Sequence, residues 1–283
     1  MSNRLIRGAL AAVLAACTVM AATPAHATGG TNDPSCKPTA DHPYPVVFLH
    51  GLGANGSEDI NLLQSDVAGK GYCTFSLTYG TGAYGSYVGG VGDISASAAQ
   101  IRSFVQQVLA ETGAAKVDLV GHSEGAFESL YVTKTQGISS QIDKVVAIAP
   151  PTHGTSFGGL YAIGETLGGQ YLIGTFLTTF GCVACTQLVD GGSAVNTLDN
   201  GPIAQPGVTY TILTSKYDEL VTPTSTSFVN EPGVTNEYVQ DTCPYDPVGH
   251  IGEAYDTNVW NMVENALDPA HAVTFTCSAG SPG

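Results

Sequence analysis

The stretch VDLVGHSEGAFESLY, residues 117–131, holds Gly121, Ser123 and Gly125 in the spacing Gly-x-Ser-x-Gly. A strand-like apolar run leads into this spacing, and helix-forming residues follow it. A serine on a sharp turn between a strand and a helix is lifted above the end of a sheet. The turn needs a positive φ at the serine and small residues on either side, because the two backbones approach closely. The stretch therefore predicts a nucleophile elbow at Ser123.

A second segment, GTSFG at residues 154–158, has the same spacing around Ser156. It comes after a Pro-Pro pair and runs into two glycines, so neither a strand nor a helix adjoins it. Since the motif has meaning only between a strand and a helix, we assign Ser156 to a loop and take Ser123 as the candidate nucleophile.

Strand-like and helix-like segments alternate along the chain. Short runs rich in Val, Ile, Tyr, Phe and Thr lie at residues 44–50, 72–79, 116–121, 144–150 and 208–215. The clearest helix between them begins near Ser95 as its N-cap and ends at Gly113. Continuous apolar strands separated by amphipathic helices predict an α/β fold, with a mostly parallel sheet covered by helices on both faces.

A serine hydroxyl needs a base, and the base needs an orienting acid. With a serine elbow in such a sheet, both follow the serine in the chain, the acid before the histidine. His250 lies in the glycine-flanked turn DPVGHIGEAY, and Asp218 lies at the carboxyl end of the strand-like run 208–215. We predict Ser123, Asp218 and His250 as a triad, and we expect Glu219 to be solvated.

The other histidines suit the role of base less well. His42 and His50 precede the serine, and His122 is its neighbour on the elbow. His271 lies beyond the last predicted helix, so we expect it at the surface. Asp199, like other acidic residues outside the strand ends, lies in a polar loop with no strand to aim it.

Two backbone N–H groups are needed to stabilise a developing oxyanion, one from the residue after the nucleophile and one from the loop after an early strand. The segment VVFLHGLGANG, residues 46–56, supplies that loop. We predict the N–H groups of Leu52 and Glu124 as the donors.

The first 27 residues are typical of a secretory signal peptide. Arg4 and Arg7 precede an apolar run, and Ala-His-Ala ends at Ala27. A lipobox at Cys17 is the weaker alternative, because that cysteine lies inside the apolar run. We expect a secreted, extracellular protein in which residues 28–283 form one domain. No later stretch has 18 apolar residues, so no integral membrane association is expected.

The chain is strongly acidic. Residues 1–27 contain two arginines and no acidic residue, so removing them lowers Lys+Arg from 9 to 7 against 24 Asp+Glu, a net charge of −17. Such a surface repels phosphate backbones, which excludes nucleic acid as a partner. The same charge opposes self-association, and we expect a monomer.

Six cysteines follow the signal peptide, an even number that favours three disulfides in an exported chain. Cys-x-x-C at 182–185 has no second ligand motif beside it, so we expect no metal. From their positions around strands and loops, we predict the pairs Cys36–Cys73, Cys182–Cys185 and Cys243–Cys277.

Several of these stretches together resemble the secreted bacterial class 2 lipases of the α/β-hydrolase superfamily. They are PVVFLHGLGAN, VDLVGHSEGA, VVAIAPPTHGTSFGGL, CVACTQL, YTILTSKYDELVTP, VQDTCP, GHIGEAYD and NALDP. The resemblance implies the α/β-hydrolase fold and supports the same triad and oxyanion donors. Its members usually carry glutamine after the serine, and Glu124 departs from this pattern. We expect the Glu124 carboxylate to point outward and to be held by hydrogen bonds.

The motifs and the resemblance imply an extracellular carboxylic ester hydrolase, expected to be a triacylglycerol lipase that works through an acyl-enzyme without a cofactor. A short-chain esterase, a polyesterase and an acyltransferase remain open alternatives, and a non-catalytic binding module is disfavoured because every triad role is filled. Of the apolar residues in the segment 154–188, we expect Phe157, Leu160 and Tyr161 to bind the acyl chain of a lipid or other ester substrate.

Overall fold

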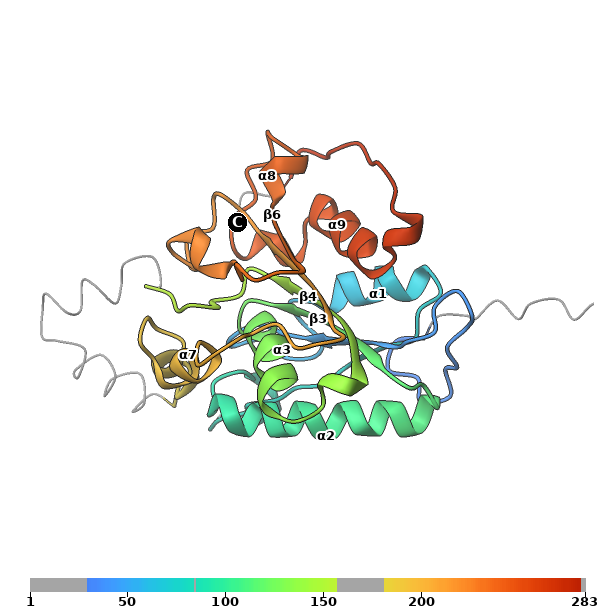
Figure 1. The fold of residues 1–283 in the computed structure, drawn as a ribbon, viewed down its shortest axis with the longest axis horizontal. Coiled ribbons are helices and arrows are strands. Elements are labelled where there is room, and N and C mark those ends of the chain that lie inside the picture. Colours follow the sequence, from blue (N-terminus) through green and yellow to red (C-terminus); the bar gives the residue numbers. More distant parts are fainter. Residues whose placement is uncertain (1–29, 84, 157–180, 281–283) are drawn as a thin grey trace, which may run out of the picture.

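Six short strands form one sheet in the computed structural model, which describes residues 30–83, 85–156 and 181–280. They are β1 (Val46–Leu49), β2 (Thr74–Ser76), β3 (Val117–His122), β4 (Ile142–Ile148), β5 (Thr209–Thr214) and β6 (Val234–Tyr238). Their order across the sheet is β2-β1-β3-β4-β5-β6, and every neighbouring pair is parallel. The expected parallel sheet is confirmed (Figure 1).

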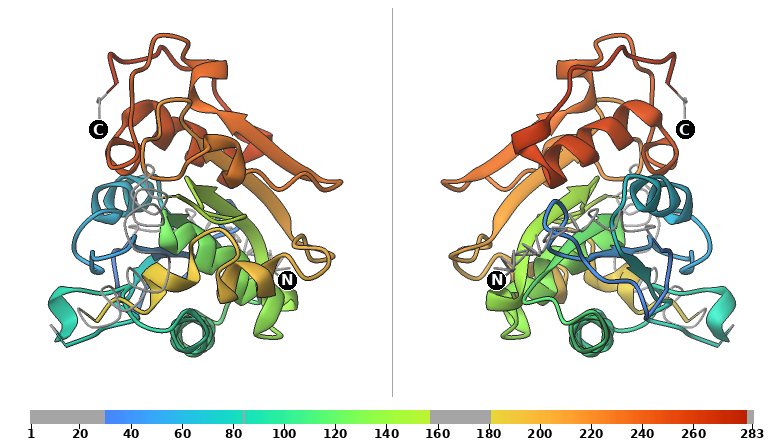
Figure 2. Two further views of the ribbon diagram at one scale, coloured as in Figure 1. Left: turned by 90° about the vertical axis from the view of Figure 1, so that its left-hand side faces the viewer. Right: turned by 90° about the vertical axis from the view of Figure 1, so that its right-hand side faces the viewer.

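Helices cover both faces of this sheet. Successive side chains of a strand point to opposite faces, so the apolar strands need cover on both. The long helices are α1 (Asn61–Gly69), α2 (Ile94–Thr112), α3 (Glu124–Thr135) and α9 (Thr257–Leu267). Val47 and Leu49 belong to the core that α2 and α3 complete, whereas Val46 and Phe48 belong to the core under α1 and α9. Both views in Figure 2 show α2 and α9 on opposite sides of the sheet.

The start of α2 differs from the prediction by two residues. The N-cap is Asp93, whose carboxylate accepts a hydrogen bond from the N–H of Ala96 at 2.9 Å. The helix thus starts at Ile94, and the side chain of this first residue is fully buried in the core. The helix ends as predicted at Gly113, which adopts a left-handed conformation with φ of 77°.

The remaining elements of the described residues are short. Short α-helices of four to six residues are α6 (Ala184–Gln187), α7 (Ser193–Leu198) and α8 (Val239–Thr242), and 3₁₀ turns lie at Gly85–Tyr87, Ser139–Gln141, Thr224–Ser227, Gly252–Ala254 and Pro269–His271. Over the described parts of the chain, none of the helices combines the length and the apolar character needed to cross a membrane.

Three disulfides join the cysteines in the order predicted. They are Cys36–Cys73, Cys182–Cys185 and Cys243–Cys277, with Cα–Cα distances of 5.8, 5.4 and 5.6 Å. The third bridge spans the turn that carries His250 together with α9, so it fastens the loop after α9 to the segment that follows β6.

Candidate active site

Ser123 lies on the strained turn that the sequence predicts. It joins β3 to α3 with φ of 55° and ψ of −120°, a backbone conformation that residues other than glycine rarely adopt. A Cβ on Gly121 would lie 2.2 Å from the carbonyl oxygen of Gly125, and one on Gly125 would lie 2.1 Å from that of Leu49. Both positions therefore require glycine, and the close strand–helix approach is confirmed.

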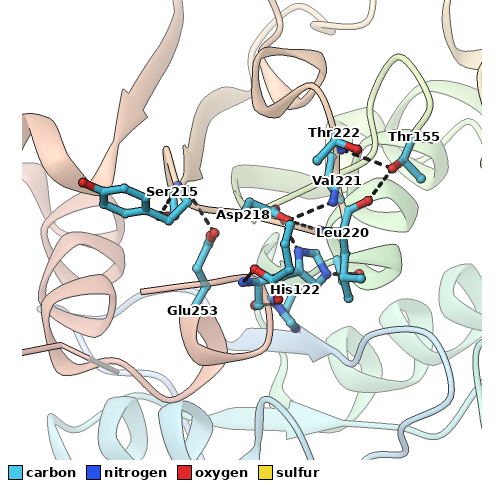
Figure 3. Close-up of polar contacts among 12 residues, drawn as sticks. His122, Thr155, Ser215, Asp218, Leu220, Val221, Thr222 and Glu253 are labelled. Carbon is cyan, nitrogen blue, oxygen red and sulfur yellow. Dashed lines mark hydrogen bonds and ion pairs between the residues drawn. The ribbon is translucent and has the colours of Figure 1, made fainter. Parts of the chain in front are cut away.

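Three side chains from separate segments meet at this turn. His250 Nε2 lies 2.8 Å from Ser123 Oγ, and His250 Nδ1 lies 2.8 Å from Asp218 Oδ2. Asp218 Oδ1 accepts hydrogen bonds from the N–H groups of Leu220 and Val221, both at 2.8 Å. Figure 3 shows how these bonds aim the carboxylate of Asp218. The geometry brings together the three residues predicted as a triad.

Thr155 fixes the loop that presents Asp218. Its hydroxyl donates to the carbonyl of Leu220 at 2.5 Å and accepts from the N–H of Thr222 at 3.2 Å (Figure 3). Thr155 follows β4, so the segments after β4 and after β5 hold one another at the carboxyl edge of the sheet.

The contacts of the ring nitrogens separate His250 from two of the three other histidines that pair with aspartate in the described residues. His122 Nε2 faces the carbonyl oxygen of His250 at 2.9 Å, and His153 Nε2 faces that of Phe228 at 3.0 Å. A carbonyl oxygen only accepts hydrogen bonds, so neither nitrogen is available to remove a proton. His250 Nε2 instead faces the hydroxyl of Ser123, which donates as well as accepts.

Glu219 has a contact that sequence reasoning missed. Its side chain is exposed, as expected, but Oε2 accepts a hydrogen bond from the N–H of His250 at 3.1 Å. Glu253 provides a second link on this side of the site. It is fully buried, and Oε1 accepts from the N–H of Ser215, at the end of β5, at 2.9 Å (Figure 3). Both acids tie the His250 turn to the Asp218 loop.

Ser156 does not join this arrangement. Its hydroxyl contacts that of Thr222 at 2.7 Å, and its N–H donates to the carbonyl of Thr222 at 3.2 Å. His271, by contrast with His250, pairs with Asp268 at the surface, where its side chain is 80% exposed. Both residues occupy the positions that the sequence predicts for them.

The expectation for the Glu124 side chain is wrong. It is completely buried, and neither carboxyl oxygen has a hydrogen-bond partner. The loop at Gly89–Gly90 covers it, since a Cβ on Gly90 would lie 2.1 Å from Glu124 Oε2. Glu128, one turn later in α3, is equally buried and unpartnered. Burial raises the pKa of both carboxyls well above the usual value, which favours their neutral forms and disfavours a negative charge of Glu124 beside the oxyanion.

A pocket of about 360 Å³ opens above Ser123, and Leu52, Glu124 and His250 also line it. Its apolar lining consists of Leu52, Ala54, Pro151, Leu188, Leu220, Val221, Ile251 and Tyr255. Leu220 and Val221 begin two residues after Asp218, and nothing in the sequence beyond their apolar character indicates that they line the pocket. Phe157, Leu160 and Tyr161, predicted as acyl-binding residues, lie outside the described residues.

A second histidine–aspartate pair underlies the pocket, and sequence reasoning missed it. His122 Nδ1 lies 2.8 Å from Asp59 Oδ1, and both residues line the pocket. Asp59 Oδ2 accepts from the N–H of Gly51 at 2.7 Å. The position of His122 within the elbow motif was a usable signal, whereas nothing in the sequence around Asp59 marks it.

The fold and this site define the class of protein: an α/β hydrolase with a serine elbow. Its structure is similar to that of a lipase B from Aspergillus fumigatus, with a TM-score of 0.60 at 17% identity, covering 87% of this chain and 57% of that one. It is also similar to the mature Bacillus licheniformis lipase BlEst2, with a TM-score of 0.56 at 15% identity, covering 86% and 97%. At these identities, the likeness establishes the fold.

The sequence identifies the family. The model of the family described as lipase (class 2) matches residues 43–262, so the chain belongs to the class 2 lipases. Over 120 residues it is 32% identical to a triacylglycerol lipase of Pseudarthrobacter phenanthrenivorans, covering 40% of this chain and 35% of the relative. A triacylglycerol lipase of Burkholderia plantarii is also 32% identical over 120 residues, with 40% and 31% covered. The match thus spans about a third of each curated relative.

Proposed function

We propose that the protein hydrolyses carboxylic esters of lipids through Ser123, His250 and Asp218. The observation that carries this proposal is the continuous contact from the Ser123 hydroxyl through the His250 ring to the buried Asp218 carboxylate, at the base of an apolar pocket. Membership of the class 2 lipases and the two triacylglycerol lipase relatives support the same chemistry.

His250 Nε2 removes the proton from Ser123 as Oγ attacks the ester carbonyl carbon. The Asp218 carboxylate holds the imidazole in the required tautomer and stabilises the imidazolium. The imidazolium then protonates the leaving alcohol as the carbon–oxygen bond breaks, which leaves an acyl group on Ser123. Water repeats the sequence, giving the free acid and restoring the serine.

Leu52 and Glu124 serve as the oxyanion donors in this mechanism. Both residues line the pocket beside Ser123, and in the described part of the chain neither backbone N–H donates to another acceptor. Donors that already point at the developing charge need no reorganisation during the reaction. Burial disfavours the charged form of the Glu124 carboxyl, and so disfavours a negative charge that would compete with the oxyanion for this N–H.

The apolar pocket favours an acyl chain longer than acetate. Leu188, Leu220, Val221 and Ile251 give it apolar walls, and each methylene buried against such walls contributes up to about 0.8 kcal/mol. We therefore expect the specificity constant to rise by up to about fourfold per methylene between acetate and medium-chain esters.

A rate profile over p-nitrophenyl esters of increasing acyl length, with emulsified triacylglycerol as a further substrate, tests this proposal. We expect kcat/KM to rise to medium chains and the emulsion to be hydrolysed. If acetate is the best substrate and the emulsion is untouched, the protein is a short-chain esterase. Failure to hydrolyse any ester, together with failure of a fluorophosphonate to label Ser123, contradicts the proposal as a whole.

We also propose that the protein is secreted. Its three disulfides support this, because such bridges persist in oxidising compartments. Recovery of the oxidised protein from the culture medium of the producing cells, compared with the cell lysate, tests this point.

A further inference from the structure

Asp59 and His122 link three segments that surround Ser123. Asp59 Oδ2 accepts from the N–H of Gly51, in the loop that carries Leu52, at 2.7 Å. Asp59 Oδ1 contacts His122 Nδ1 at 2.8 Å, and His122 Nε2 contacts the carbonyl oxygen of His250 at 2.9 Å. A single chain of hydrogen bonds therefore runs from the oxyanion loop to the backbone of the catalytic histidine.

The contacts of His122 restrict its protonation. A backbone carbonyl oxygen accepts hydrogen bonds and never donates, so Nε2 must carry a proton. Asp59 accepts from the Gly51 N–H and faces His122 Nδ1 with its other oxygen, so this nitrogen is also the donor when Asp59 is ionised. When Asp59 is ionised, His122 therefore carries protons on both nitrogens and is an imidazolium.

We propose that His122, held as an imidazolium by Asp59, is a positioning residue of the ester-hydrolase site. It sets the backbone of the His250 turn relative to the loop that carries the Leu52 oxyanion donor. The role rests on the proposed function, because it acts through His250 and Leu52. Neither His122 nor Asp59 takes part in bond making or proton transfer with the ester.

The charges around His122 agree with this state. Burial disfavours the imidazolium, but the carboxylate of Asp59, the carbonyl of His250 and the more distant Asp218 favour it and raise the pKa of His122. The pKa of Asp59 is lowered: burial opposes its ionisation, and His122 beside it, the Gly51 N–H and the more distant His50 outweigh burial.

The surroundings of Asp59 leave it little freedom. Its backbone has φ of 65°, a conformation that residues other than glycine rarely adopt, and its N–H donates to the hydroxyl of Tyr255 at 3.1 Å. A Cβ on Gly51 would lie 3.2 Å from Asp59 Oδ2, 3.2 Å from the Cβ of Ser123 and 3.5 Å from His122 Nδ1. The oxyanion loop therefore packs directly on the elbow and on this pair, so a shift of the pair is transmitted to both.

The chain supplies a matched control in His153 and Asp199. There too Nδ1 contacts a carboxylate, at 2.7 Å, and Nε2 contacts a carbonyl oxygen, that of Phe228, at 3.0 Å. The side chains of this pair are 39% and 37% exposed, and neither residue lines the pocket above Ser123. The same hydrogen bonds are thus present without a link to the triad.

The kinetic test compares Asp59→Asn with Asp199→Asn on a soluble p-nitrophenyl ester. When its oxygen accepts from the Gly51 N–H, Asn at position 59 turns its NH₂ toward His122 Nδ1, which can accept this bond only if the ring loses its imidazolium charge. We expect kcat to fall about 10- to 100-fold with KM changed less than about threefold, since small misplacements of catalytic groups have costs of this size. Asp199→Asn should keep kcat within about twofold.

Three kinetic results overturn the positioning role. They are a wild-type kcat in folded Asp59→Asn, an equal loss of kcat in Asp199→Asn, and a loss that only matches the unfolded fraction measured by circular dichroism. A wild-type protein that hydrolyses no ester in the series overturns the proposed function instead. The two failures are therefore distinguishable.

Nitrogen-15 NMR of histidine-labelled wild-type protein tests the protonation without any variant. We expect the assigned ring of His122 to show two protonated nitrogens at pH 7.5. A ring with one unprotonated nitrogen at that pH overturns the proposal, even if Asp59→Asn fails to fold.

Discussion

Two buried histidine–aspartate pairs lie beside Ser123, and they differ in one contact. In both pairs, imidazole Nδ1 lies 2.8 Å from a carboxylate oxygen. The second nitrogen of His250 faces a hydroxyl, whereas that of His122 faces a carbonyl oxygen. The first arrangement suits a base that gains and loses a proton, and the second suits an imidazolium that keeps both. The group that faces Nε2, and not the histidine–aspartate pair itself, therefore decides the role of each histidine.

The largest effect should come from removing the hydroxyl that distinguishes the two pairs. Ser123→Ala should lower kcat for ester hydrolysis by about 10⁶-fold, as for serine nucleophiles that act within a triad. Ser156→Ala is the control, because it removes the other Gly-x-Ser-x-Gly serine, which contacts Thr222 and not His250. Steady-state assays of both variants measure the difference.

Comparable losses in folded Ser123→Ala and Ser156→Ala would show that the contact between Ser123 and His250 does not define the nucleophile. Full activity of Ser123→Ala would remove the basis for treating the two histidine pairs differently.

A smaller effect should separate the two aspartates. Asp218→Asn should lower kcat by about 10⁴-fold, because an amide at this position favours the wrong tautomer of the catalytic imidazole. Asp59→Asn should lose at most about 100-fold, because it disturbs only the placement of the His250 backbone and of the loop that carries Leu52. The ratio of the two kcat values on one ester measures the difference, and equal losses or the reverse order would contradict the assignment of roles.

Much of the fold and the elbow can be predicted from the sequence because the signals are local. The run of apolar residues before Ser123, the glycines at 121 and 125 and the helix formers after them specify a strand, a turn and a helix over 15 residues. Asp218 and His250 also follow strand-like segments, so their place at the carboxyl edge of a parallel sheet follows from their order in the chain.

The contacts that sequence reasoning missed join residues distant in the chain. Asp59 and His122 are 63 positions apart, and no pattern around Asp59 indicates that a carboxylate there meets the elbow. The buried position of Glu124 was also missed, because a carboxyl after the serine is expected to face water. The glycine loop at 89–90 closes over it, which depends on how separate segments pack.

The acids of the site extend the same contrast between groups that have a partner and groups that lack one. Asp218 and Asp59 are buried and accept hydrogen bonds on both oxygens. For Asp59, these bonds and the neighbouring His122 outweigh burial and lower its pKa. Glu124 and Glu128 are buried with no hydrogen bond on either oxygen, which favours their neutral forms. Asp59 and the two glutamates therefore predict opposite changes in the stability of the protein as the pH rises.

The smallest predicted effect is on stability and concerns Glu124→Gln. The folded protein raises the pKa of Glu124 well above the ordinary 4.5, because the carboxyl is buried. Below pH 4.5 both the folded and the unfolded chain hold this proton, so the substitution should change the free energy of unfolding little. Above it, the unfolded chain ionises first, so the wild type loses stability as the pH rises through this window and the glutamine variant does not.

Urea unfolding should show Glu124→Gln more stable by about 1–3 kcal/mol at pH 8 and about equal to wild type at pH 4. The exposed Glu58→Gln should shift neither value by more than about 0.5 kcal/mol. A gain for Glu124→Gln that is the same at both pH values would mean that the Glu124 carboxyl is ionised in the folded protein, and its burial would then require a partner.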